Sequence, residues 1–249
     1  MKILQEQEQT ASYISRILTA FKTSEGTIKP HFVITGNSGT GKSFLVSKLA
    51  AETKLDIIHV NAAQVTQEGV SGNSLSKVLS PLADTEGRLT VVFIDEFDKW
   101  FTPDSKGTVN VATTPIQNEF LKLLESDSTE VFGNYGKYVS VSLERVLFVF
   151  AGAFNGKTVK STKDLLELGV KKEFVGRVAL LTETSPLSLE SLLTHLKQSQ
   201  LLQDYCKVFP EAKKSKAVAE ISKNLSEAFS QNVLGIRLVS NLIHQYFIK

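Results

Sequence analysis

The strongest constraint on the fold of this chain is residues 36–43, whose sequence GNSGTGKS matches the pattern G-x-x-x-x-G-K-[ST]. Residues 31–35 before it are apolar and β-prone, as a buried parallel strand would be. Residues 44–50 after it carry apolar side chains at helical spacing. A strand, a glycine-rich loop and a helix in this order are the context in which the pattern binds phosphate. The sequence therefore predicts that the chain binds a nucleoside triphosphate.

Each residue type in this loop suits one part of that task. The glycines let backbone N–H groups surround the β-phosphate, and the N-terminus of the following helix adds partial positive charge. Lys42 is expected to contact the β- and γ-phosphates of ATP, and the Ser43 hydroxyl to be a ligand of Mg²⁺. The residues of this segment that we expect to contact the nucleotide are Gly36, Asn37, Ser38, Gly39, Thr40, Gly41, Lys42, Ser43 and Phe44.

Two acidic residues follow the apolar strand that is predicted over residues 89–94. In a parallel sheet the C-terminal ends of the strands face the ligand crevice, so Asp95 and Glu96 are expected beside the phosphate loop. Asp95 is predicted to hold Mg²⁺, directly or through water. Glu96 is predicted to orient and deprotonate the attacking water.

The order of predicted elements indicates the fold class. A helix over residues 8–22 precedes the first strand, and further strands are predicted at residues 56–61, 146–150 and 178–181. Strands that alternate with helices imply a parallel sheet covered by helices on both faces. We therefore expect an α/β P-loop domain over residues 1–185, and a small all-helical domain over residues 186–249 after Ser185-Pro186.

Composition adds mainly exclusions. The 249 residues carry a net charge of +2 with a pI near 8.5, which favours neither nucleic acid nor a membrane surface. The longest apolar run, residues 146–154, is too short to span a bilayer, and the N-terminus has no signal-peptide core. The single cysteine, Cys206, excludes an internal disulfide and suits a reducing compartment. We expect a soluble cytoplasmic protein.

Four segments resemble AAA+ ATPases, particularly the ClpX-type protein unfoldases. They occur in the same order as in that family, at residues 61–69, 91–99, 147–154 and 164–177. The last one is the most specific, because it contains the distinctive Glu-Phe-x-Gly-Arg sequence that ends at Arg177. The resemblance extends from about Ile3 to the C-terminal helix.

The resemblance implies a homo-oligomeric ring, usually of six subunits, with ATP bound between neighbours. Arg177 matches the arginine finger, which would reach the γ-phosphate in the adjacent subunit. A guanidinium there supplies a fixed positive charge to the transition state. The resemblance also implies a protein client, whose identity the sequence does not give.

The departures from the family bear on mechanism. The family's lid carries two arginines, of which the first senses nucleotide. Leu234 occupies that position here, while Arg237 matches the second arginine and is the substitute we expect to contact nucleotide. The family's pore loop, Gly-Tyr-Val-Gly, appears as residues 69–72 with Val70 in place of the aromatic residue. Only a short link joins Phe154 to Asp164, where the family has the insertion that docks the ClpP peptidase.

The N-terminal zinc-binding domain of the family also has no counterpart here, so we expect a stand-alone remodelling ATPase that is not coupled to ClpP. Two other functions stay open. One is a nucleic-acid-associated AAA+ ATPase, such as a helicase loader or transposition regulator. The other is a slow ATP-dependent switch or scaffold. Many AAA+ proteins have a polar side chain that acts as a sensor at the end of the strand that corresponds to residues 146–150. No such side chain is evident here, and Asn155 is only a weak candidate.

Overall fold

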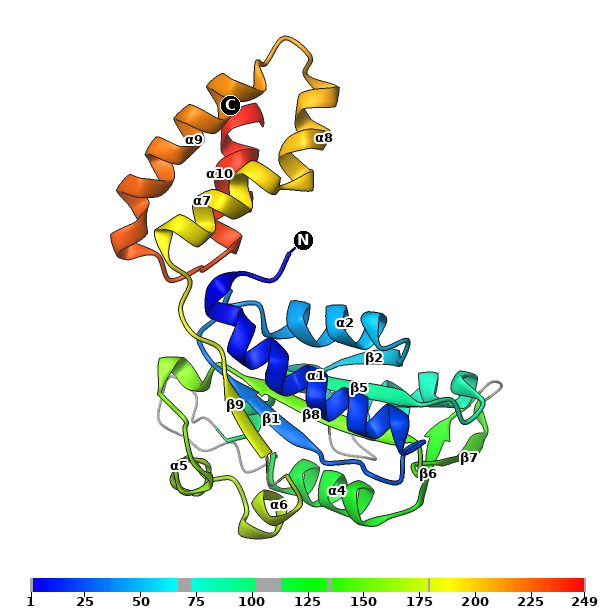
Figure 1. Ribbon diagram of the computed structural model, residues 1–249. Coiled ribbons are helices and arrows are strands. Elements are labelled where there is room, and N and C mark those ends of the chain that lie inside the picture. The colour runs from blue at the N-terminus through cyan, green and yellow to red at the C-terminus, as the bar shows by residue number, and fades with distance from the viewer. Residues whose placement is uncertain (1, 67–72, 102–112, 134–135, 179, 249) are drawn as a thin grey trace. The chain divides into compact units, whose positions relative to one another are not determined.

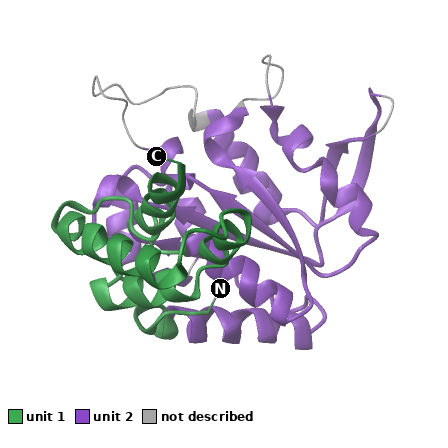
Figure 2. Ribbon diagram, turned by 90° about the horizontal axis from the view of Figure 1, so that it is seen from above, with its two compact units in different colours: residues 1–9, 37–41, 184–249 green, residues 10–36, 42–183 purple. Residues whose placement is uncertain are grey.

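The computed structural model describes residues 2–66, 73–101, 113–133, 136–178 and 180–248 (Figure 1). The chain divides into two compact units, which are coloured separately in Figure 2. The first comprises residues 1–9, 37–41 and 184–249, and the second comprises residues 10–36 and 42–183. Each unit is described by itself below.

The second unit is built on a parallel sheet. Among the described residues it has five strands in the order β2-β5-β8-β1-β9, and every neighbouring pair is parallel. The strands are β1 (Phe32–Thr35), β2 (Asp56–Asn61), β5 (Thr90–Asp95), β8 (Val146–Gly152) and β9 (Leu180–Glu183). The three central strands are almost entirely buried, as expected for a sheet covered on both faces. The predicted α/β P-loop fold class is confirmed.

Helices cover both faces of this sheet (Figure 1). On one face lie α1 (Glu8–Thr23) and α2 (Lys42–Glu52), and on the other lie α4 (Thr113–Glu125), α5 (Thr162–Glu167) and α6 (Lys172–Arg177). The helix predicted over residues 8–22 is α1, and Ile14, Ile17, Leu18 and Phe21 lie on its buried face. Amphipathic helices of this kind are stabilised mainly by packing on the sheet.

Smaller elements complete this unit. A parallel pair of short strands, β3 (Val65–Thr66) and β4 (Asn73–Ser74), leads into the single-turn helix α3 (Leu75–Val78). An antiparallel hairpin of β6 (Ser128–Phe132) and β7 (Tyr138–Ser142) lies outside the main sheet. A 3₁₀ turn, η4 (Phe97–Trp100), follows β5 directly.

The predicted start of the last strand needs correction, and one predicted loop lies outside the described residues. The last strand was expected from residue 178, but Val178 ends α6, and its N–H donates to the carbonyl of Phe174 (3.1 Å). The strand therefore begins two residues later, at Leu180. Residues 69–72, which match the family's pore loop, lie outside the described residues, as do residues 102–112.

The first unit is a helical bundle joined by the N-terminal residues. Its helices are α7 (Leu189–Gln198), α8 (Gln200–Val208), α9 (Lys214–Ala228) and α10 (Arg237–Ile248). Leucine, isoleucine and valine side chains from all four helices form its core, together with Leu4 from the N-terminal segment. The C-terminal part is thus helical, as expected. The domain boundary after residue 185 stays a prediction.

Glu6 joins the N-terminal segment to the start of α7. Its carboxylate accepts hydrogen bonds from the Ser188 N–H (2.9 Å) and from the Ser191 hydroxyl (2.6 Å). Partial burial alone would raise the pKa of Glu6, but these hydrogen bonds outweigh it and lower the pKa to about 2. The ionised form of Glu6 is therefore the form that holds the two segments together.

We expect Glu6→Gln to destabilise the protein by about 2 kcal/mol at pH 7, because an amide cannot accept both hydrogen bonds through oxygen. The pKa is lowered in the folded state, so the stabilisation is complete above the unfolded-state value of 4.5 and is lost as the pH falls toward about 2. Urea denaturation at several pH values measures the difference. Glu8→Gln, at an exposed neighbouring carboxylate, is the control. An equal difference at pH 7 and pH 2.5 would contradict this assignment.

Candidate functional site

The centre of the candidate site in the second unit is the C-terminal end of β5. The Ser43 hydroxyl, in the first turn of α2, donates to Asp95 Oδ2 (2.9 Å). The other carboxylate oxygen of Asp95 accepts the N–H of Glu96 (2.9 Å). The structure thus brings together the two residues predicted as metal ligands, although they are far apart in the sequence. A hydroxyl and a carboxylate are hard oxygen donors, which fit Mg²⁺ when phosphate oxygens and water complete its shell.

Lys42 begins α2 and is buried to 8% exposure. Its ammonium group donates to the carbonyl oxygen of Gly36 (2.7 Å), across the phosphate loop. Gly36 and Gly41 have φ angles of 129° and 95°, a region that favours glycine. Both ends of the loop therefore have the glycine backbone conformation that the G-x-x-x-x-G-K pattern supplies.

Glu96 is held in a left-handed backbone conformation, with φ at 57°, and its side chain is exposed. Such angles are uncommon for residues other than glycine and cluster at functional sites. The following residue, Phe97, is fully buried in an aromatic cluster and anchors the turn. Glu96 is therefore presented at the end of β5 by a rigid support.

Asp98 is a residue of this region that the sequence reasoning missed. It is 2% exposed, and its Oδ1 accepts the N–H of Ala153 (3.2 Å) at the end of β8. Gly152 leaves room for it, because a Cβ there would lie 3.0 Å from the same carboxylate oxygen. Asp98 thus ties the turn after Glu96 to the end of β8. The only signal in the sequence was its place in residues 91–99, one of the segments that resemble AAA+ ATPases.

The end of β8 has an unusual backbone. Phe154 and Asn155 have φ angles of 48° and 53°, so two successive non-glycine residues are left-handed. Asn155 is exposed there, at the same edge of the sheet as the end of β5. This conformation keeps Asn155 a candidate polar sensor, as the sequence suggested only weakly.

In the first unit, residues 37–41 of the phosphate loop contact the segment that precedes α10. The N–H of Ile236 donates to the carbonyl of Gly39 (3.0 Å). A Cβ on Gly39 would lie 2.0 Å from the carbonyl oxygen of Leu234, and one on Gly235 would lie 2.5 Å from that of Gly39. Since real Cβ atoms do not approach this closely, the backbones can meet only because both residues are glycine. We call this the glycine contact.

Side chains add to the glycine contact. Arg237 donates from Nη1 to the Ser38 hydroxyl (3.1 Å), and Gln7 donates from Nε2 to the carbonyl of Thr40 (2.7 Å). The structure therefore places the predicted lid arginine against the phosphate loop. Gln7 and Gly235 were not predicted as contacts; Gly235 lies between Leu234 and Arg237 in the lid stretch compared with the family, whereas no motif in the sequence marks Gln7.

Arg177 belongs to the second unit, at the end of α6. Its guanidinium donates to the carboxylate of Glu125 on α4 (2.9 Å), and the two side chains are 53% and 43% exposed. An exposed pair of this kind is worth only about 0–1 kcal/mol. Arg177 is thus available at the surface for a stronger partner.

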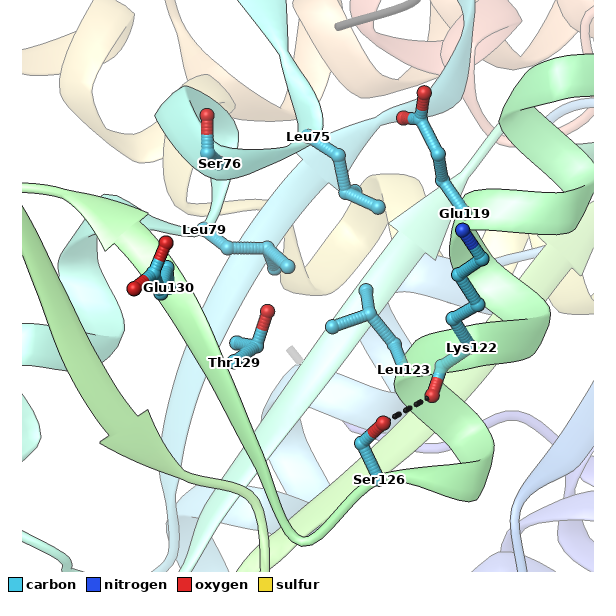
Figure 3. Close-up of a pocket in the computed structure, with 9 residues that line it drawn as sticks. All are labelled: Leu75, Ser76, Leu79, Glu119, Lys122, Leu123, Ser126, Thr129 and Glu130. Atoms are coloured by element: carbon cyan, nitrogen blue, oxygen red, sulfur yellow. Dashed lines mark hydrogen bonds between the residues drawn. The ribbon is translucent and has the colours of Figure 1, made fainter.

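A cavity of about 360 Å³ lies elsewhere in the second unit, between α3, α4 and β6 (Figure 3). Leu75, Leu79 and Leu123 contribute apolar side chains to its lining, and Glu119 and Glu130 contribute carboxylates. None of its lining residues is a predicted nucleotide contact. The cavity is therefore separate from the candidate site.

Residues 32–161 match the family described as "ATPase family associated with various cellular activities (AAA)", which is just over half of the chain. The chain belongs to the AAA family of ATPases. The matched region holds the phosphate loop, Asp95 and Glu96, and it ends before α5. Membership agrees with the fold and with the contact between Ser43 and Asp95.

The curated relatives of this chain include several ATP-binding ClpX subunits of Clp proteases. An ATP-dependent Clp protease ATP-binding subunit ClpX of Bacteroides thetaiotaomicron is 26% identical over 228 residues, which cover 73% of this chain and 55% of the relative. The corresponding subunit of Bacteroides fragilis is 27% identical over the same shares. ClpX 2 of Wolinella succinogenes is 27% identical over 206 residues, covering 68% and 51%. This AAA chain spans about half the length of the curated relatives it matches. Within its described residues, no helix is long and apolar enough to cross a membrane.

Proposed function

We propose that the chain hydrolyses ATP to remodel a protein partner, as a ClpX-like AAA ATPase. The observation that carries the proposal is the contact between Ser43 and Asp95, at the end of the strand that presents Glu96. This pair supplies the oxygen ligands of a Mg²⁺–ATP site in a chain of an ATPase family.

The residues would divide the chemistry as follows. Ser43 and Asp95 hold Mg²⁺, which neutralises phosphate charge when it is bound. Lys42 contacts the β- and γ-phosphates, and the backbone N–H groups of residues 37–41 surround the β-phosphate. Glu96 orients the attacking water and accepts its proton. Arg237, through Ser38, keeps the lid segment on the phosphate loop.

Arg177 is proposed to act on a neighbouring subunit. Its guanidinium is exposed and held only by a weak ion pair with Glu125, so it can exchange that partner for a γ-phosphate at little cost. This requires a head-to-tail ring, for which we propose six subunits from the resemblance to ClpX. The nucleotide would then be bound between neighbours.

The partner is proposed to be a protein that is not passed to ClpP. Only η6 (Phe154–Gly156) and a short segment separate β8 from α5, which leaves no room for the peptidase-docking insertion of ClpX-type proteins. We propose that the client contacts residues 68–74 and 102–115. The cavity in Figure 3 is lined by α3 and α4, the helices that follow these two segments in the sequence.

Light-scattering mass of the Glu96→Gln protein, with and without ATP, tests the proposal. Removing the base should keep ATP bound but stop turnover, so a ring held by ATP cannot disassemble. We expect the mass to rise from 27.4 kDa to several times that value on adding ATP. Lys42→Ala is the control and should stay at the lower mass. A monomer with ATP shown to be bound would contradict the ring, and rapid turnover by Glu96→Gln would contradict the role of Glu96.

A further inference from the structure

Glu96 and Arg177 are joined inside one subunit by a pair of stacked phenylalanine rings. Phe97 directly follows Glu96, and Phe174 lies three residues before Arg177 on α6. Their ring centroids are 5.4 Å apart with 26° between the planes. The two side chains are 0% and 1% exposed. The proposed base and the proposed finger therefore rest on the same buried contact.

A third ring closes this cluster. Phe150 of β8 lies 5.0 Å from Phe97 and 5.0 Å from Phe174, measured between centroids. Rings packed this closely leave little free volume, so a displacement of one ring shifts the others. The position of Phe174 is thus set by β8 and by the turn that follows Glu96.

The orientation of α6 depends mainly on this packing. The helix has only six residues, too few to be stable by itself. Its buried side chains are Phe174 and Val175, at 1% and 7% exposure. The ion pair between Arg177 and Glu125 is half exposed and contributes little. Phe174 is the larger and more deeply buried of these two side chains, so it anchors α6 close to Arg177.

We propose that Phe174, through its stack on Phe97, is a positioning residue that aims Arg177 at the nucleotide of the neighbouring subunit. The inference rests on the proposed function, because it requires Arg177 to act across an interface. It adds a link within each subunit between the turn that presents its own base and the finger that it gives to its neighbour.

Phe174→Leu removes the stack and keeps an apolar side chain. We expect kcat for ATP hydrolysis to fall about ten- to a hundredfold, the loss typical of a misplaced catalytic group, with KM little changed. Phe21→Leu is the matched control. Phe21 is also fully buried, but it lies on α1, which covers the face of the sheet opposite α6. The control should keep its activity close to wild type.

Mixing subunits separates aiming of the finger from a general structural role. A Glu96→Gln subunit keeps ATP bound and joins rings, but has no working site of its own and presents an intact finger. A Phe174→Leu subunit has an intact site but presents a misplaced finger. When the two are mixed, a Phe174→Leu site that receives the finger of a Glu96→Gln neighbour should hydrolyse ATP. Random mixing of equal amounts makes about one quarter of the sites competent, since neighbours meet head to tail.

We therefore expect the mixture to reach up to about a quarter of wild-type activity per subunit, although each variant alone is far less active. Arg177→Ala mixed with Glu96→Gln is the reference. Recovery in the reference without recovery for Phe174→Leu overturns the inference alone, as does full activity of Phe174→Leu by itself. Failure of both mixtures overturns the finger in trans, and the proposed ring mechanism with it. Phe174→Met, whose unbranched side chain fills irregular gaps better than leucine, replaces Phe174→Leu in the same mixture if the leucine variant unfolds.

Discussion

Lys42→Ala is expected to weaken ATP binding by at least about a hundredfold. Two charge-assisted hydrogen bonds to phosphate are lost, each worth about 1.5–3 kcal/mol, and about 1.4 kcal/mol corresponds to a factor of ten. The side chain is poised for this, since it is buried to 8% exposure and lies across the loop on the Gly36 carbonyl. Calorimetric titration with a slowly hydrolysed ATP analogue measures the loss.

The matched control is Lys48→Ala on the same helix. Lys48 forms a partly exposed i,i+4 ion pair with Glu52, so its removal should leave ATP affinity unchanged. Thermal unfolding without nucleotide should show that Lys42→Ala is folded. Undiminished affinity in a folded Lys42→Ala protein would exclude Lys42 as the phosphate contact.

The second large effect is expected from Arg177→Ala. Arginine fingers supplied in trans are worth about 10³–10⁵ in rate in the best-studied GTPases, and we expect a loss of at least about a hundredfold in kcat here. ATP affinity should change little, because Arg177 pairs with Glu125 in its own subunit and the predicted phosphate and metal contacts there are other residues, Lys42, Ser43 and Asp95. Steady-state hydrolysis over a range of protein concentrations measures it. Wild-type activity per subunit should also rise with concentration as rings form.

Glu125→Gln separates the finger from the ion pair. It removes the partner that Arg177 has within its own subunit and keeps the guanidinium. If Arg177 acts on a neighbour, Glu125→Gln should retain most activity, while Arg177→Ala loses it. If both variants lose activity equally, the ion pair itself is what matters, and the finger assignment fails.

The main sheet could be predicted because its strands are buried on both faces. Residues 90–95 and 146–152 read as apolar runs that end in acidic or small residues, and they form β5 and β8. The contact between Ser43 and Asp95 followed from the phosphate loop and from the rule that parallel strands present their C-terminal ends together. Local patterns and one topological rule were sufficient there.

The hairpin of β6 and β7 was not predicted, for a physical reason. Its strands are short and mostly exposed, so Ser128–Phe132 and Tyr138–Ser142 lack the apolar runs that marked the main sheet. The start of β9 was misplaced because Val178 is apolar and buried in either setting. Burial alone does not distinguish the end of a helix from the start of a strand.

Contacts between distant segments were out of reach of sequence patterns. Gln7 reaches the carbonyl of Thr40, and Asp98 reaches the N–H of Ala153, through single hydrogen bonds that leave no periodic signal. The stack of Phe97 on Phe174 is similar, since both residues read simply as apolar. Such contacts depend on how the elements pack, which one sequence does not specify locally.

The glycine contact has a consequence for how this sequence can change over generations. Because the carbonyl of Leu234 and the backbone of Gly39 occupy the space a side chain would need, neither Gly39 nor Gly235 can gain one without displacing the other. No compensating substitution exists, since shrinking a partner below glycine is impossible. Two codons far apart in the gene are therefore fixed together. Leu234 can vary, because it takes part through its backbone alone.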